Sequence, residues 1–204
     1  MARAFPVEPV AAGKQVVDVS ADPYEITRDF GHGAKTSPFQ NAGAMQKGQA
    51  FTAKVAPRYD GERRVLGELL VPDAEVPEQF FIPDEKIAAW EYQRSAKKEP
   101  RVTSAGYEYM YTEGTMAFPD PTDKPARTIL TGEGGAGASR MKHAVSGDSR
   151  RIRRLVPDEL DQIQMFPKGW TDTGMSDARR AFCMGNALVV GIPHAIGIEI
   201  AKRA

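Results

Sequence analysis

The sequence has very little cysteine, since Cys183 is the only one among 204 residues. A single cysteine excludes an internal disulfide and any metal site built from several thiolates. The three histidines, His32, His143 and His194, are scattered without the spacing of metal ligands, so no metal site is expected. Cys183 itself stands between a phenylalanine and a methionine, the usual setting of a small buried hydrophobic residue rather than of a nucleophile.

The sequence also lacks long hydrophobic runs and an excess of one charge. No uninterrupted apolar run approaches the roughly 18 residues of a membrane span, and the first residues, MARAFPVEP, lack the apolar core of a signal peptide. A cytoplasmic protein without a membrane segment is therefore expected. Lys and Arg total 27, as do Asp and Glu, so the net charge does not indicate a nucleic-acid partner.

Basic residues nevertheless gather in one segment. Residues 140–154, RMKHAVSGDSRRIRR, contain six Arg or Lys residues against one Asp. Such a run could neutralise several phosphates of a nucleic acid. A solvated loop would explain the same composition, and charge alone does not separate the two interpretations.

The first two thirds of the chain predict short strands joined by turns. The strand candidates alternate apolar and polar residues or are rich in aromatic residues: Lys14–Val19 and Tyr24–Thr27, paired across residues 21–23, then Ala50–Val55 and Tyr107–Tyr111. Residues 64–70 are ambiguous between a strand and a helical turn. A helix is expected over about 84–97, opened by Pro83 and limited by Pro100.

The last third predicts helices instead. Residues 157–165 read as a short helix with Pro157 in its first turn, and a final apolar helix is expected from about Val189. Pro193 is compatible with that helix only near its beginning. The sequence thus predicts the α/β class, with a β-rich body followed by C-terminal helices.

A glycine-rich segment, Gly132–Gly137 (GEGGAG), follows the strand-like residues 127–131 and matches the pattern G-x-G-x-x-G. A dinucleotide-binding turn needs a helix immediately after the glycines, and the residues that follow have no apolar helical stripe. A loop whose backbone approaches a ligand closely is the favoured interpretation.

Residues 153–167, RRLVPDELDQIQMFP, combine an arginine, a Pro-x-Glu step and a Phe-Pro end. This run resembles the ninth motif of bacterial DNA (cytosine-5) methyltransferases, R-x-L-T-P-x-E-x-x-R-L-x-x-F-P. The matching residues are Arg153, Leu155, Pro157, Glu159, Phe166 and Pro167. Val156 and Gln162 replace the usual Thr and Arg, which implies weaker internal contacts at those two positions.

Residues 184–190, MGNALVV, resemble the tenth motif of the same family. The resemblance implies that Asn186 and Ala187 help to wall a pocket for S-adenosylmethionine. A Gly–Asn corner that leads into a helix would offer a side-chain amide and helix N-terminal N–H groups to the cofactor.

Residues 125–135, PARTILTGEGG, resemble the family's recognition-region signature, with Thr128–Ile129 as its central dipeptide. The resemblance implies that the loop after it approaches double-stranded DNA, a task suited to glycine because the backbone must enter a groove. The implied DNA contacts are Thr128, Thr131, Gly134, Gly135, Ser139, Arg140, Lys142 and His143.

Other motifs of the family are missing from the sequence: the F-x-G-x-G cofactor loop, the Pro-Cys nucleophile and the Glu-Asn-Val step. The resemblance therefore assigns no catalytic residue to this chain. It implies a β-rich target-recognition domain over 1–150. Over 151–204 it implies a segment with the two motifs, packing on a methyltransferase catalytic domain that lies mostly outside the chain.

Several hypotheses account for these features. The leading one is a subunit of a split methyltransferase whose partner carries the catalytic motifs, suggested by a Met1 start near the recognition region. The others are a truncated inactive fragment, a non-catalytic DNA-binding protein, and a stand-alone nucleotide-dependent enzyme that uses Gly132–Gly137. Membership of a restriction–modification pair or of another defence system is left open.

Overall fold

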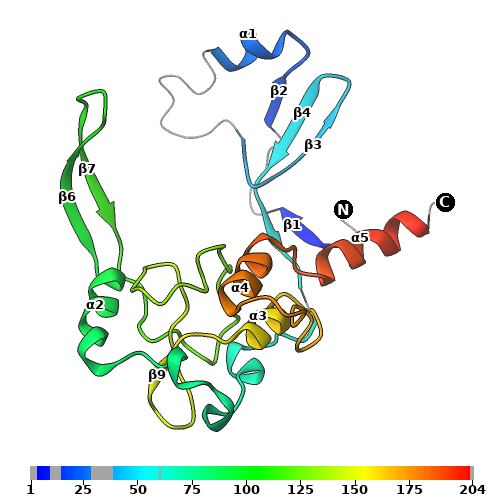
Figure 1. The fold of residues 1–204 in the computed structure, drawn as a ribbon. Helices are drawn as coiled ribbons and strands as arrows, with labels where there is room; N and C mark the ends of the chain where they lie inside the picture. The colour runs from blue at the N-terminus through cyan, green and yellow to red at the C-terminus, as the bar shows by residue number, and fades with distance from the viewer. Residues whose placement is uncertain (1–3, 10–14, 29–38, 60, 203–204) are drawn as a thin grey trace. The chain divides into compact units, whose positions relative to one another are not determined.

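The computed structural model of the chain describes residues 4–9, 15–28, 39–59 and 61–202, and it divides into two compact units. Unit 1 comprises residues 1–61 and 195–204, and unit 2 comprises residues 62–194. Helices and strands are mixed along the chain, which confirms the mixed class (Figure 1). The expected functional boundary at residue 150 lies inside unit 2, and that division stays a prediction about motifs.

The described part of unit 1 is built from short antiparallel strands. They are β1 (Val7–Pro9), β2 (Gln15–Asp18), β3 (Ala42–Gln46), β4 (Gln49–Ala53) and β5 (Val55–Pro57). β1 pairs with β5, and β4 is the central strand of a sheet ordered β2-β4-β3. No apolar side chain described in this unit is buried, and the buried residue there is Thr52. Its hydroxyl donates to the Ala42 carbonyl (3.1 Å) and accepts from the Gln40 N–H (2.6 Å).

The predicted strand pair across residues 21–23 is wrong. Residues Pro23–Arg28 form a short helix, α1, and β2 pairs with β4 instead. The helix forms because the Asp22 carboxylate accepts the Tyr24 N–H (2.9 Å) while Pro23 occupies the first helical position with its φ already set. An Asp-Pro start was therefore a stronger local determinant than the β-propensity of the residues that follow.

Unit 2 contains most of the regular structure. Three 3₁₀ turns come first, at Leu66–Leu69, Asp73–Glu75 and Glu78–Phe80, so the ambiguous residues 64–70 include a helical turn. The remaining elements are α2 (Asp84–Arg94), β6 (Lys97–Val102), β7 (Glu108–Glu113), β8 (Val145–Ser146), β9 (Ile152–Arg153), α3 (Pro157–Ile163) and α4 (Asp177–Asn186). The helix expected at 84–97 is confirmed, but it ends at Arg94 because β6 begins at Lys97.

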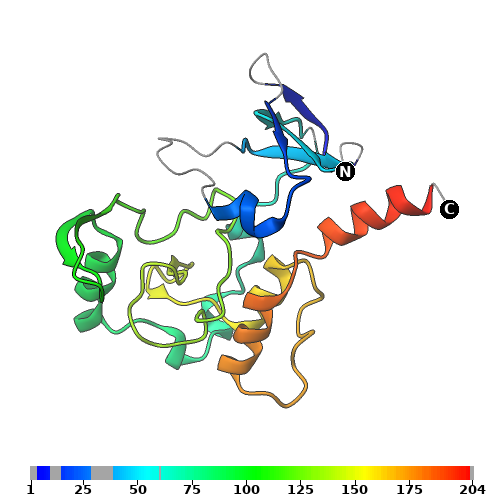
Figure 2. The same cartoon turned by 90° about the horizontal axis from the view of Figure 1, so that it is seen from above.

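The largest hydrophobic cluster of unit 2 joins the recognition-like segment to the two C-terminal helices. Its fully buried members are Leu66, Ile129, Val145, Leu155, Leu160, Ala181 and Met184. Leu160 lies on α3 and Met184 on α4, and these helices are side by side in both views (Figure 1, Figure 2). Burial of such side chains stabilises the packing by about 1.5–3 kcal/mol each. Segments as far apart in the sequence as Leu66 and Met184 are thereby held in one core.

The sequence did not predict α4, although its start signal is readable. Ser176 is the N-cap residue, and its hydroxyl accepts the N–H of Arg179 (3.4 Å). Ala181 and Met184 follow at helical spacing and are buried. The glycine and polar residues around 172–176 concealed this pattern.

The final helix, α5 (Gly191–Ala201), has Pro193 in its first turn, as expected. No residue of α5 is buried. The stretch Asp177–Ala201, which includes α4 and α5, is long and apolar enough to cross a membrane by length and composition. A single such stretch is weak evidence for a span, and the buried face of α4 belongs to the core of unit 2.

Candidate functional site

Arg153 lies at the centre of a buried ion-pair cluster. Its Nε donates to Asp73 (2.6 Å), and its two terminal nitrogens donate to Glu159 (2.8 and 3.0 Å), so the contact with Glu159 is bidentate. Glu159 also accepts the backbone N–H groups of Val71 (2.9 Å) and Val156 (2.8 Å). Every charge in the cluster is thus paired. Arg153 and Glu159 of the ninth motif hold the segment around Asp73 against the start of α3.

The Asp73 carboxyl completes this cluster on the side of the basic segment. Burial raises its pKa, but hydrogen bonds from Ser149 and Arg153 outweigh the burial and lower the pKa below its usual range. The Ser149 N–H donates to the same carboxylate (3.0 Å). Asp73 therefore ties the middle of the short loop between β8 and β9 to Arg153 of β9.

The other ninth-motif residues shape α3 and its exit. Pro157 is the first residue of α3 and is buried. Val156 has no side-chain acceptor, so the cap consists of the Glu159 carboxylate alone, and the substitution of the usual Thr removes one hydrogen bond. Phe166 packs against the largest cluster and against the ring of Trp170 (centroids 5.7 Å apart), while Pro167 is exposed.

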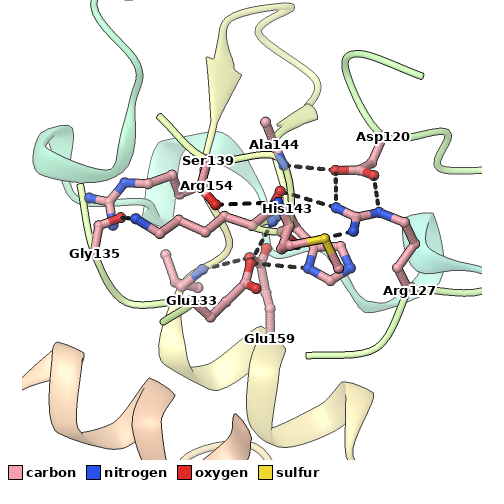
Figure 3. A network of polar contacts seen from close by, with 12 residues as sticks. Asp120, Arg127, Glu133, Gly135, Ser139, His143, Ala144, Arg154 and Glu159 are labelled. Carbon is pink, nitrogen blue, oxygen red and sulfur yellow. Dashed lines mark hydrogen bonds and ion pairs between the residues drawn. The ribbon is translucent and has the colours of Figure 1, made fainter. Parts of the chain in front are cut away.

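A second ion cluster surrounds Asp120, which the sequence did not indicate. Arg94 binds one of its oxygens (2.9 Å). Arg127 binds the other (2.7 Å), and the Ala144 N–H adds a third bond (2.9 Å) (Figure 3). Burial raises the pKa of Asp120, but the bonds from Arg127 and Arg94 prevail and lower it to about 2. The cluster connects the end of α2 to the residues just before β8.

The glycine-rich segment forms a loop and no helix follows it, so the Rossmann-type interpretation has no structural support among the described residues. Gly134 packs against α4 so closely that an added Cβ would lie 2.8 Å from the Cα of Ala178. Packing therefore explains this glycine without a nucleotide. Lys142 closes the loop by donating to the carbonyls of Gly135 and Gly137 (both 2.9 Å).

The expected DNA-contacting residues are not all at the surface. Thr128, Thr131 and Gly135 are exposed, and Ser139 is half-buried with its hydroxyl accepting the Met141 N–H (3.3 Å). Ile129, the other half of the recognition dipeptide, is buried in the largest cluster. The structure therefore turns one side chain of the dipeptide outward and the next inward.

His143 is fully buried. Its backbone N–H donates to Glu133 (2.6 Å), and its Nδ1 lies 3.0 Å from the same carboxylate oxygen (Figure 3). A side chain in this position offers no surface to a DNA base, so the expected contact by His143 is corrected to an internal contact that anchors the loop.

Arg140 is half-buried and points its guanidinium at backbone carbonyls rather than at solvent. It donates to Gln93 and Ser95 (both 3.3 Å) and also to Gly114. Glu113 lies 3.5 Å away. Arg140 thus joins the end of α2 to the two chain segments at the base of the β6–β7 hairpin.

The basic run at 140–154 therefore does not act as one surface patch. Arg153 and Arg154 are buried, whereas Arg150 and Arg151 are exposed. Arg154 donates to the carbonyls of Gln79 (2.7 Å) and Gly134 (3.3 Å) and lines a cleft of about 380 Å³ beside the start of α4. Burial lowers its pKa from the usual range.

The tenth-motif residues follow this cleft at the other end of α4. An added Cβ on Gly185 would overlap the backbone of Leu130 and Thr131, so this helix touches the recognition segment directly. Asn186 ends α4, is exposed, and donates to the Phe182 carbonyl (2.9 Å). The expected corner at a helix N-terminus is corrected, because the next helix begins only at Gly191.

Ala187 and Cys183 are both half-buried. Ala187 is half-buried, and its carbonyl accepts from the Gln164 amide (3.4 Å), which also donates to Met184 (2.7 Å). Cys183 is a free, half-buried thiol on α4. Within the described ranges, no group of three or more His, Cys, Asp or Glu residues is arranged to hold a metal ion.

Comparisons with known proteins bear on this arrangement. The C-5 cytosine-specific DNA methylase family matches residues 43–202. This chain belongs to that family. Type II methyltransferase M.Sau3AI of Staphylococcus aureus is 35% identical over 203 residues, which are 98% of this chain and 46% of that protein. The chain thus spans about half the length of this relative.

No solved structure matches the chain. Membership of the C-5 cytosine-specific DNA methylases supports the resemblance stated for the two C-terminal motifs, since the match includes both of them. The match also extends upstream to residue 43, well before residue 125, where the first recognisable motif begins. The whole of unit 2 therefore lies within the family match.

Gly185→Ala tests the contact between α4 and the recognition segment. We expect a loss of about 1–3 kcal/mol in the free energy of unfolding, because the new Cβ meets backbone that cannot rotate away. The matched control is Gly197→Ala on α5, where no atom lies within 4 Å. It should be neutral or stabilise by up to about 1 kcal/mol. Urea unfolding measures both, and equal shifts in the two variants would contradict the contact.

Asp120→Asn tests the second ion cluster through pH. Because the folded pKa of about 2 lies below the value of 3.8 for an unpaired carboxyl, ionised Asp120 contributes stability above pH 4 that is lost as pH falls toward 2. The contribution is about 2.5 kcal/mol, with roughly half lost by pH 3. The difference in unfolding free energy between the two proteins should therefore shrink from pH 7 to pH 3. A difference independent of pH would refute the assignment.

Proposed function

We propose that this chain supplies target recognition and the last two motifs of a DNA (cytosine-5) methyltransferase. The observation that carries the proposal is the contact of Gly185 with Leu130 and Thr131, because it joins the cofactor-side motif to the recognition segment. The largest hydrophobic cluster includes Ile129 and Met184, and it supports the same connection between the recognition segment and α4. DNA bound by one segment is then placed at a defined position relative to the cofactor.

The division of labour follows from the motifs in the sequence. In the family's reaction a cysteine thiolate adds to C6 of a flipped cytosine, and C5 then accepts the methyl group. C5 finally loses its proton as the C6–S bond breaks and the thiolate is released. The Pro-Cys and Glu-Asn-Val motifs do not occur in this sequence. A catalytic methyltransferase subunit outside these 204 residues would supply them. The present chain binds and orients double-stranded DNA.

S-adenosylmethionine, the methyl donor of the family, would meet this chain at Asn186 and Ala187. The exposed carboxamide of Asn186 is a suitable hydrogen-bonding group for the polar parts of the cofactor. Gln164 holds the backbone of Ala187 in place. These residues fit one wall of a pocket, and the remaining walls belong to the catalytic subunit.

The apolar surface after α4 supports a docking role. Leu188 is 71% exposed, and Ile192, Ile198 and Ile200 on α5 are also exposed. So many exposed large apolar side chains within one short segment are unusual on an isolated soluble protein. We expect the catalytic subunit to cover them, with the assembled enzyme acting in the cytoplasm as a modification methyltransferase.

The test is reconstitution. The chain alone should transfer no methyl group from labelled S-adenosylmethionine to DNA, and adding a polypeptide with the family's Pro-Cys motif should restore transfer. The part of the S. aureus relative that this chain does not match is a suitable probe. Transfer by the chain alone would overturn the proposed division. DNA binding that ignores both the partner and S-adenosylmethionine would favour a non-catalytic DNA-binding protein instead.

Cys183→Ala provides a separate test of the same division. Cys183 is half-buried on α4 and free, and the proposal gives it no chemical role. Methyl transfer by the reconstituted complex should stay within about twofold of the unmodified protein. If the folded variant complex lost transfer completely, Cys183 would be the nucleophile and the proposal would be wrong.

A further inference from the structure

The β6–β7 hairpin projects from unit 2 beside α2 (Figure 1). Lys97–Val102 and Glu108–Glu113 pair antiparallel over six positions. None of the buried residues of the described chain comes from this hairpin, and its outer half, residues 100–110, is exposed throughout. Val102, Met110 and Tyr107 are 64%, 52% and 70% exposed. A two-stranded ribbon with no core is marginally stable alone, so it needs support at its base or a partner at its tip.

The base of the hairpin is held firmly. Arg140 donates to the carbonyls of Ser95, just before β6, and of Gly114, just after β7. Lys97 and Glu113, the first cross-strand pair, lie 3.5 Å apart, and both side chains are largely shielded from solvent. The hairpin is thereby fixed in direction although its outer half makes no contact with the core.

Its dimensions match a DNA groove. Six residues at about 3.3 Å each make a ribbon of roughly 20 Å, and its two strands lie about 5 Å apart. The major groove of B-form DNA is about 12 Å wide and 8.5 Å deep and admits a two-stranded ribbon. The outer half of the hairpin could therefore reach base edges while the base remains outside the groove.

The side chains of the outer half suit base recognition better than protein docking. The outermost pairs, Arg101 with Tyr109 and Val102 with Glu108, each bring a charged group to the surface. The Arg101 guanidinium stacks over the Tyr111 ring at 3.5 Å, which restricts its orientation before any partner binds. Arginine reads guanine and a carboxylate reads cytosine in the major groove. Charged residues such as Glu108 are depleted at the core of protein–protein interfaces.

We propose that the β6–β7 hairpin enters the major groove of the target DNA and reads its sequence, with Arg101 as a base-contacting residue. This inference rests on the proposed function, since it names the recognition element within it. Arg140 then acts as a positioning residue that directs the hairpin, and it does not itself contact a base. Arg140 follows the glycine-rich segment Gly132–Gly137, so this segment of the chain supports the base of the hairpin.

The experiment selects binding sites from a pool of randomised double-stranded DNA, using the full chain with its catalytic partner. The unmodified protein should enrich one sequence. Arg101→Ala should lose discrimination at one or two base pairs by about 5- to 150-fold, with weak binding to unrelated DNA little changed. Arg101 is exposed and paired with the neighbouring Glu99 (3.4 Å). Arg28→Ala is the matched control, because Arg28 is likewise exposed and paired with a neighbouring glutamate (2.9 Å). It should enrich the same sequence as the unmodified protein.

Arg140→Ala separates positioning from contact. If Arg140 directs the hairpin, this variant relaxes the same base pairs as Arg101→Ala, and the double variant relaxes them no further. If Arg140 touched a base, it would relax a different base pair, and the positioning role would be overturned. A merely structural loss would lower the unfolding midpoint without altering the selected sequence, which would also overturn it.

The outcomes distinguish the two levels of the proposal. If the unmodified complex enriches no sequence, the proposed function and the hairpin inference fail together. If it enriches a sequence that Arg101→Ala retains in full, the hairpin inference alone is overturned. Retained DNA selection with lost binding of the catalytic partner would make the hairpin a protein-docking surface, which also overturns it.

Discussion

Arg153 holds two carboxylates, Asp73 and Glu159, in a space from which solvent is excluded, and unit 2 depends on that contact. The three side chains come from a 3₁₀ turn, from β9 and from α3, so the cluster joins segments some 80 residues apart in the sequence. Unpaired charges at this depth would cost several kcal/mol each, whereas the bidentate pair satisfies both oxygens of Glu159. In the ninth motif, Arg153 and Glu159 thus have a primarily architectural role.

Unit 2 relies on such clusters because it has little regular structure to rely on. Its strands β8 and β9 have two residues each, and long loops connect its helices. In these loops Asp120 binds two arginines, and Glu133 accepts the backbone N–H of His143. These contacts hold the loops in place as the hydrogen bonds between strands hold a sheet. Polar groups of a buried loop must find partners in this way, since water cannot reach them.

The need to pair buried polar groups also determines what the arginines of the basic segment 140–154 can contact. An arginine in a solvated loop is available to phosphate, but Arg140 and Arg153 are occupied by carbonyls and carboxylates inside the protein. The proposed recognition of DNA therefore uses an element whose outer half is exposed. The β6–β7 hairpin is that element. Arg140, which follows the glycine-rich segment, fixes the direction of the hairpin at its base.

The sequence by itself determined the family, the short helices at Asp84 and Pro157, and the residues Arg153, Glu159 and Gly185 as important positions. These depend on local patterns: a proline at a helix start, an apolar period, a motif at fixed spacing. It did not determine α1, α4, the burial of His143, or the role of Asp120. Only the tertiary structure decided those, because whether a charged side chain faces DNA or a buried partner depends on residues far away in the chain. A single sequence records the charge of Arg140, but the carbonyls that receive its hydrogen bonds are positioned by the fold.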